Sequence, residues 1–213
     1  MQTRQLPGLA LWAASLAVIP ASAQQADFTF YSPLAEDWYQ AAEAFEWTST
    51  TENNNGQRVQ VSYRTFGSRS APALVLLHGF PTSRFDFREM IEFLEDDYFI
   101  ATLDFPGFGF SDKPQGDYSY MLEDDAKLVD YYVREILGLT SFSLFTHDRG
   151  VSVGLAFLDN YLANENREYE ITYHFLSNSG MFLPLANLSA GQTTLLDPVR
   201  GPAATALGQA RPR

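Results

Sequence analysis

The chain has 213 residues, of which 46% are apolar and 19% charged, a composition typical of a globular protein with its own core. Its formal net charge of −12, from 14 basic and 26 acidic residues, argues against a nucleic-acid partner, because binding phosphates requires a basic surface. The absence of cysteine excludes thiol chemistry, disulfides and cysteine-based metal sites, and the sequence shows no other cluster of metal ligands. We therefore expect neither a metal nor a cofactor.

The N-terminal residues have the three parts of a secretory signal peptide. Met1–Gly8 carries one basic residue, the apolar run "LALWAASLAVI" follows, and "PASAQQ" places small residues before a cleavage point. The apolar run is too short to cross a bilayer as a helix. We predict a signal peptide over 1–23, export to the periplasm or beyond, and no membrane attachment after cleavage. An uncleaved N-terminal anchor is the alternative.

The next segment, 24–44, is interpreted as an N-terminal extension, with a short helix in "EDWYQAAEAF". Two strand-like runs then flank Asn55-Gly56, and apolar residues alternate at Val59, Val61 and Tyr63. Asn-Gly is a strong hairpin signal, and a turn of the usual hairpin type requires positive φ at both residues. We expect a hairpin there.

Strands and helices alternate from residue 73 onward. The expected strands cover 73–77, 97–104, 141–145 and 169–180, and the expected helices cover 83–95, 118–137 and 151–163. The continuous apolar run "ALVLL" is typical of a strand that is buried on both faces of a sheet. This alternation predicts an α/β fold with a mostly parallel sheet.

Three loops follow strand ends and therefore should share one crevice, because ligands of open parallel sheets bind at the carboxyl ends of the strands. They are "HGFP" (78–81), "DFPGFGFSD" (104–112) and "THDRG" (146–150). Asp148 lies at the corner between a strand and a helix, where a nucleophile elbow presents its side chain. Gly150 stands two residues after it, and Thr146 takes the preceding position where glycine is more usual.

A carboxylate at such a corner can attack an electrophilic carbon and form an ester. The start of the following helix stabilises its charge, and the backbone N–H groups of Phe80 and Arg149 are placed to polarise the ester. The alternative is that Asp148 is an ordinary helix N-cap, a position that favours Asp.

"LVLLHGFPTS", "ATLDFPGFGFSDKP" and "LFTHDRGVSVG", in this order and spacing, resemble the α/β-hydrolase superfamily. The H-D-x-G elbow resembles the haloalkane dehalogenase and epoxide hydrolase branch, in particular the mesoderm-specific-transcript-like group, over roughly 45–200. The resemblance implies hydrolysis of a small epoxide or haloalkane-like substrate through an aspartyl ester. It assigns Asp148 as nucleophile and Phe80 and Arg149 as oxyanion-hole donors. The substrate pocket that it implies is lined by His78, Gly79, Phe80, Pro81 and Arg149.

The sequence departs from this family pattern in several places. Dehalogenases usually carry Trp after the nucleophile, and fluoroacetate dehalogenases carry Arg there with a second Arg three residues on, where this chain has Ser152. A serine esterase is a weak alternative, because Ser152 lies a full turn past the elbow. The family also needs a late His that activates water. His78 is expected to order its own loop, His147 lies inside the elbow motif, and His174 is expected to pack inside a strand.

The C-terminal part changes character. We divide the rest of the chain into a hydrolase core at 45–180, the start of a lid at 181–200 and a non-family tail at 201–213. We expect a reading frame that breaks near residue 200, with the last strands and most of the lid missing, an exposed sheet edge and impaired turnover. The alternative function is a non-catalytic hydrolase-fold fragment that binds a small ligand or a protein. The sequence carries no indication of oligomeric state.

Overall fold

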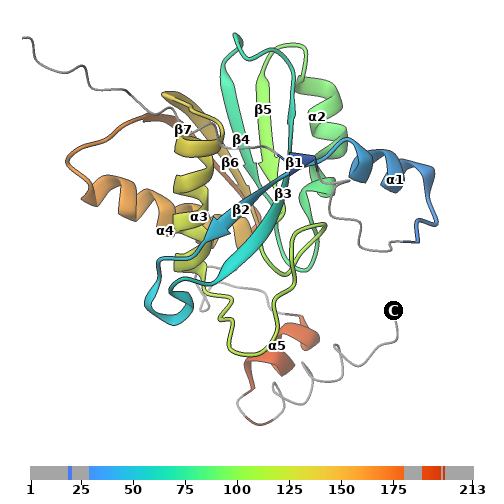
Figure 1. Cartoon of the computed structure of the whole chain (residues 1–213), viewed down its shortest axis with the longest axis vertical. Helices are drawn as coiled ribbons and strands as arrows, with labels where there is room; N and C mark the ends of the chain where they lie inside the picture. The colour runs from blue at the N-terminus through green and yellow to red at the C-terminus, as the bar shows by residue number, and fades with distance from the viewer. Residues whose placement is uncertain (1–18, 21–28, 180–188, 198, 200–213) are drawn as a thin grey trace, which may run out of the picture.

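The computed structural model describes residues 19–20, 29–179, 189–197 and 199, and a single sheet with helices on both faces forms its centre (Figure 1). The sheet order is β1-β2-β3-β5-β4-β6-β7. The strands are β1 (Ile19–Pro20), β2 (Glu43–Thr48), β3 (Arg58–Phe66), β4 (Ala73–Leu77), β5 (Phe99–Leu103), β6 (Ser141–His147) and β7 (Glu170–Ser177). Strands β5, β4, β6 and β7 run parallel, whereas β1, β2 and β3 pair antiparallel up to β5. The predicted α/β fold is confirmed.

The described helices include some on each face of this sheet. They are α1 (Pro33–Gln40), η2 (Glu52–Asn54), η3 (Arg84–Phe87), α2 (Arg88–Leu94), α3 (Leu122–Tyr131), η4 (Tyr132–Ile136), α4 (Arg149–Ala163) and α5 (Ala190–Leu196). Helices α3 and α4 lie together on one face, and α2 lies on the other (Figure 1). None of the helices in the described ranges has the length and apolar character needed to span a membrane.

Strand β4 is buried on both sides, as its continuous apolar run predicts. Leu76 packs in one cluster with Ile91 of α2. Leu77 packs in the other cluster with Leu128 of α3 and Phe157 of α4. Each apolar residue of such a strand is removed from water, and full burial of a Leu or Ile side chain is worth about 1.5–3 kcal/mol. The sheet is therefore a rigid base for the loops at its carboxyl edge.

The hairpin around Asn55-Gly56 forms with a different turn from the one expected. Strands β2 and β3 pair antiparallel, with Phe45 opposite Val61. Asn55 has φ −52° and ψ 120°, and Gly56 has φ 78°. The N–H of Gln57 donates to the carbonyl of Asn54 at 2.8 Å. These values describe a type II turn, so the expectation of positive φ at both residues was wrong, and only Gly56 needs it.

The long helix expected over 118–137 begins later and changes its winding. Helix α3 starts at Leu122 and continues from Tyr132 as the π-helical turn η4. Asn54 holds the preceding loop in a non-helical conformation, because its side chain donates to the carbonyl of Ser119 at 2.7 Å and accepts from the N–H of Ser119 at 2.8 Å. The spacing of apolar residues along 118–137 could not predict this contact, because Asn54 lies 65 positions before Ser119.

The N-terminal segment also differs from its prediction. The short helix α1 begins at Pro33 and ends at Gln40, and the last three residues of the expected helix, Glu43–Phe45, belong to β2. Strand β2 therefore begins inside the segment interpreted as an extension. Strand β1 falls within the predicted signal peptide, and the rest of that segment lies outside the described residues. The expected tail at 201–213 and half of the expected start of the lid also lie outside them, and the described half comprises α5 and its neighbours.

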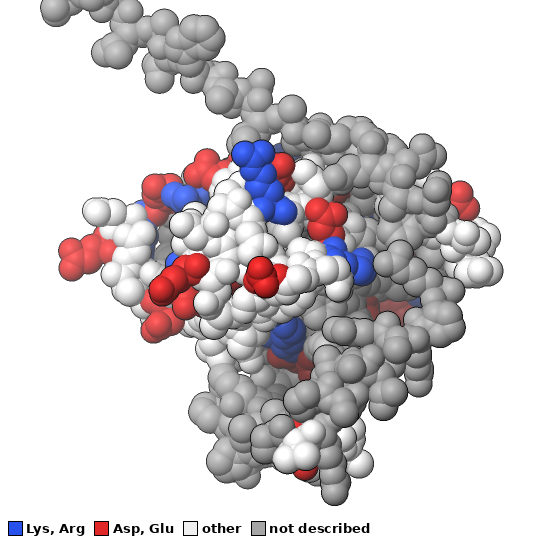
Figure 2. All heavy atoms as spheres, turned by 60° about the horizontal axis from the view of Figure 1, so that its bottom comes forward, with Lys and Arg blue, Asp and Glu red and all other residues white. Residues whose placement is uncertain are grey.

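The charged side chains of the described residues have both signs on the face shown in Figure 2 and are separated there by uncharged ones. The acidic excess of the sequence is therefore not gathered into one continuous patch on this face.

Candidate active site

Asp148 forms the sharp corner between β6 and α4. Its φ of 51° and ψ of −116° lie outside the regions that non-glycine residues usually occupy. The backbone is held on both sides, since the N–H of Asp148 donates to the carbonyl of Ser177 at 3.1 Å and its carbonyl accepts from Val151 at 3.1 Å. Strain of this kind persists where the surrounding structure imposes it, and it is concentrated at functional sites.

Glycines permit the close approach of the segments around this corner. A Cβ on Gly79 would lie 2.6 Å from the Cβ of Asp148, and one on Gly150 would lie 2.3 Å from the carbonyl oxygen of Leu77. Thr146, which stands where glycine is more usual, is accommodated by another glycine, because a Cβ on Gly154 would lie 2.7 Å from the Thr146 methyl group. The loop after β4 and the start of α4 are thus packed directly against Asp148.

The carboxylate of Asp148 receives two backbone N–H groups on the same oxygen. Phe80 donates to Oδ1 at 2.8 Å, and Arg149 donates to it at 2.6 Å. The other oxygen, Oδ2, has no hydrogen-bond partner within the described part of the chain. An ordinary N-cap side chain accepts from the second or third helical residue, whereas Asp148 accepts from the first. The two predicted donors therefore meet at the predicted nucleophile.

His78 is wholly buried beneath this loop and has both ring nitrogens engaged. Its Nδ1 lies 2.8 Å from the carbonyl of Gly79, and its Nε2 accepts from the N–H of Phe105 at 3.0 Å. Burial lowers the pKa of His78, which favours the neutral ring that this pattern requires. The ring fixes the course of the loop that carries Phe80.

The predicted pocket residues are not all enclosed. The side chain of Phe80 is 56% exposed, with its ring centroid 6.1 Å from that of Phe108, and Pro81 is also exposed. A cavity of about 210 Å³ between α3 and α4 is lined by none of the predicted site residues. Phe80, one of the two residues whose N–H groups contact Asp148, thus carries an exposed aromatic side chain.

Arg149 directs its side chain away from the corner toward α3. Its Nη2 pairs with Oδ2 of Asp125, and its guanidinium carbon lies 5.4 Å and 5.5 Å from the ring centroids of Phe105 and Phe108. Burial raises the pKa of Asp125 to about 6, although the charge of Arg149 acts to lower it. The Arg149 charge is therefore already paired.

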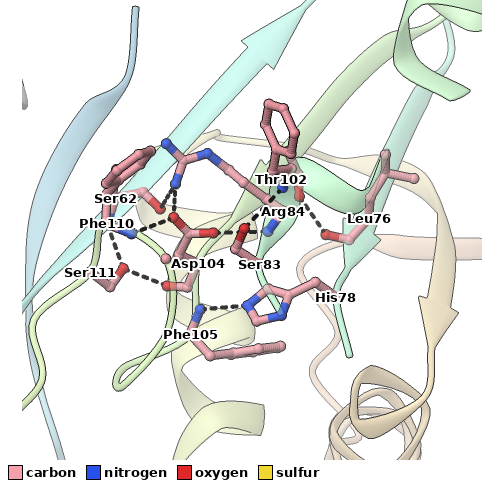
Figure 3. Close-up of polar contacts among 12 residues, drawn as sticks. Ser62, Leu76, His78, Ser83, Arg84, Thr102, Asp104, Phe105, Phe110 and Ser111 are labelled. Atoms are coloured by element: carbon pink, nitrogen blue, oxygen red, sulfur yellow. Dashed lines mark hydrogen bonds and ion pairs between the residues drawn. The ribbon is translucent and has the colours of Figure 1, made fainter. Parts of the chain in front are cut away.

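A second buried pair, which the sequence motifs did not indicate, joins the loops after β4 and β5 (Figure 3). Asp104 pairs with the guanidinium of Arg84, and both side chains are almost wholly buried. The Asp104 carboxylate also accepts from the N–H of Arg84 at 2.9 Å and from the N–H of Phe110 at 2.8 Å. The only sequence signal was an acidic residue at a strand end before a glycine-rich loop.

The remaining candidate side chains make no hydrogen bond to the Asp148 carboxylate within the described part of the chain. His174 lies on β7, half-buried, with Nε2 2.9 Å from the hydroxyl of Thr146. Burial lowers its pKa. Ser152 lies in the first turns of α4, and His147 ends β6 beside the corner. Within the described ranges, no group of three or more His, Cys, Asp or Glu side chains could hold a metal ion.

Residues 72–167 match the family described as alpha/beta hydrolase fold. The chain is 36% identical over 141 residues to LipZ of Mycobacterium tuberculosis, a protein named as a hydrolase. The alignment covers 66% of this chain and 47% of LipZ. It is 39% identical over 116 residues to the mesoderm-specific transcript homolog protein of Bos taurus, covering 53% of this chain and 34% of that protein. It is 34% identical over 89 residues to epoxide hydrolase 4 of Mus musculus, and this alignment covers 41% of this chain and 24% of that protein.

These relatives confirm the resemblance predicted from the three motifs. The chain spans about half the length of LipZ and less of the other two.

Proposed function

Since residues 72–167 match the alpha/beta hydrolase fold family, we propose that this chain is a hydrolase whose nucleophile is Asp148. The observation that carries the proposal is that the two oxygens of the Asp148 carboxylate have different environments. Oδ1 is held by the N–H groups of Phe80 and Arg149, at 2.8 Å and 2.6 Å, and no described residue hydrogen-bonds Oδ2. An oxygen in that state is available to attack a carbon atom.

The proposed first step forms a covalent ester. Oδ2 attacks an electrophilic carbon, and a new C–O bond forms. In an epoxide the ring C–O bond breaks, and the resulting alkoxide takes a proton from water. In an alkyl halide the C–halogen bond breaks, and the halide leaves with the bonding electrons. Oδ1 then becomes the ester carbonyl oxygen, and the same two N–H groups polarise it for attack by water.

The site favours a small neutral substrate. The charge of Arg149 is paired with Asp125 and so is not free to hold a carboxylate. The rings of Phe80 and Phe108 pack against each other next to the Phe80 N–H group that contacts Asp148, and they offer an apolar surface. An epoxide or haloalkane-like molecule fits these properties, and the similarity to epoxide hydrolase 4 supports the epoxide.

The second step, hydrolysis of the ester, is expected to be slow in this chain. A base must activate water, and two of the three histidines are already engaged in hydrogen bonds. Both nitrogens of His78 are engaged, and His174 is bonded to Thr146 on an edge strand. We therefore propose that the ester accumulates.

Intact-mass spectrometry tests this proposal. The protein is incubated with styrene oxide or with an alkyl bromide, and we expect the mass of one epoxide, or of one alkyl group, to be added at Asp148. Asp148→Asn should abolish the adduct, and peptide mapping should place it at that residue in the wild-type chain. The absence of an adduct at Asp148 with both classes of electrophile would refute the ester mechanism.

A non-catalytic binding protein is the second candidate, because His78 and His174 are engaged in hydrogen bonds and Phe80 is 56% exposed. In that case calorimetry should detect binding of small apolar alcohols or diols without any adduct. Binding that is unchanged in Asp148→Asn would favour this function over the enzymatic one.

A further inference from the structure

Arg149 connects two carboxylates through two different groups. Its backbone N–H donates to Oδ1 of Asp148 at 2.6 Å, and its guanidinium pairs with Asp125 in the first turn of α3. The nucleophile at the start of α4 is thus linked to a neighbouring helix through a single residue.

The guanidinium is held in one place. The side chains of Arg149 and Asp125 are 14% and 5% exposed, so water competes little for their contact. Phe105 and Phe108 present their rings to the guanidinium carbon at 5.4 Å and 5.5 Å. An arginine fixed by a buried carboxylate and two rings loses its side-chain freedom, and its backbone is restrained with it.

The same two rings are also connected, through His78, to the loop that carries the other N–H donor, Phe80. His78 packs against Phe105 at 5.0 Å and against Phe108 at 5.5 Å between ring centroids. Its Nδ1 contacts the carbonyl of Gly79, directly before Phe80. The packing around the Asp125–Arg149 pair is therefore continuous with the loop that supplies the second hydrogen bond to Asp148.

We propose that Asp125 is a positioning residue for the nucleophile, which acts through the side chain of Arg149. This inference rests on the proposed function of Asp148. Without the Asp125 carboxylate, the Arg149 side chain loses its only ion pair among the described residues. The corner at Asp148, whose φ is 51°, then loses one of its restraints, and Oδ2 no longer keeps its direction of attack.

The test compares three variants for the rate of adduct formation with styrene oxide. Asp125→Asn removes the charge and keeps the shape, and Asp125→Glu keeps the charge. Asp130→Asn is the matched control, because Asp130 lies on the same helix and pairs with Arg134 at 3.1 Å, away from the corner. We expect Asp125→Asn to lower the maximal rate roughly 10- to 100-fold, as misplacement of a reacting group does, with little change in the half-saturating concentration. Asp125→Glu should recover part of the rate, and the control should match the wild type.

A second measurement tests the inference without depending on adduct formation. In ¹⁵N-labelled protein, the short hydrogen bond to a carboxylate should shift the Arg149 amide proton downfield. Asp125→Asn should move that signal upfield, whereas Asp130→Asn should leave it in place.

The outcomes separate the two proposals. If the wild type forms an adduct and Asp125→Asn forms it equally fast, the positioning role is overturned and the nucleophile stands. If the rate loss only matches a loss of folded protein, measured by circular dichroism, the role is structural and the inference also fails. If the wild type forms no adduct, the proposed function fails, and the Arg149 amide shift alone decides whether Asp125 holds the corner.

Discussion

At the scale of single residues, Asp125 experiences two opposing effects. Burial is the larger and disfavours its charged form, and the neighbouring Arg149 favours that form. Asp124, on the same helix, adds a smaller repulsion, and Tyr118 and Tyr120 from the preceding loop are the other titratable groups that sense its charge. The net result is a pKa raised to about 6. Ionised Asp125 thus orders the site at a cost to stability, as is common for buried ion pairs.

The pH dependence of unfolding should reveal this cost. A carboxyl whose pKa is raised in the fold stabilises the folded state while it is protonated, and this contribution is lost as the pH rises from its ordinary pKa of 3.8 to about 6. The wild-type free energy of unfolding, relative to that of Asp125→Asn, should therefore fall by on the order of 2–3 kcal/mol between pH 4 and pH 7. Denaturant titrations at both pH values measure it. A difference that does not vary with pH would contradict the assignment.

At the scale of elements, the Arg84–Asp104 pair holds together the two loops that precede the site. Arg84 belongs to η3, after the loop that carries Phe80, and Asp104 follows β5. Two other nitrogens of the Arg84 guanidinium, Nε and Nη2, have no partner in the described part of the chain, so its charge depends on Asp104. A Cβ on Gly109 would lie 2.2 Å from the Asp104 carboxyl carbon, which shows how closely the second loop wraps this carboxylate.

Removal of one member of this pair should be costly. Asp104→Asn leaves a buried, uncompensated guanidinium, and we expect the free energy of unfolding to fall by about 3–5 kcal/mol. Glu92→Gln is the control, because Glu92 pairs with Arg88 on the surface of α2 at 3.1 Å, and its loss should cost less than about 1 kcal/mol. Chemical denaturation of both variants gives the comparison. Equal losses would show that the buried pair has no special role.

At the scale of the whole molecule, β7 forms one end of the sheet among the described strands and pairs only with β6. Its apolar side chains are open to solvent, with Tyr173 67%, Phe175 50% and Leu176 54% exposed. An edge strand that combines free backbone groups with apolar side chains is a template for pairing with another chain.

This edge should make the described part of the protein self-associate. A charge on the edge opposes such pairing, so Tyr173→Lys should raise the concentration at which light scattering increases by several-fold. Phe93→Lys is the matched control, because Phe93 is 83% exposed but lies on helix α2. If both variants shift the onset equally, net charge rather than the edge is responsible.

Local sequence patterns were sufficient to predict the alternation of strands and helices, the buried character of β4, and the position of Asp148 between β6 and α4. These features depend on nearby residues. Burial of one face sets the spacing of apolar residues along a strand or helix, and a sharp corner needs glycines close to it in the sequence. The predicted meeting of Phe80 and Arg149 with Asp148 also follows from parallel strand ends sharing one edge.

The partners of the long polar side chains could not be predicted from local patterns, because they lie far away in the sequence. Arg149 is paired with a residue 24 positions before it, and Arg84 with one 20 positions after it. Likewise, the start of α3 at Leu122 depends on Asn54, a contact across 65 positions. Such choices depend on which elements pack together and on which charges they bury, because a buried charge must find a partner wherever the fold supplies one.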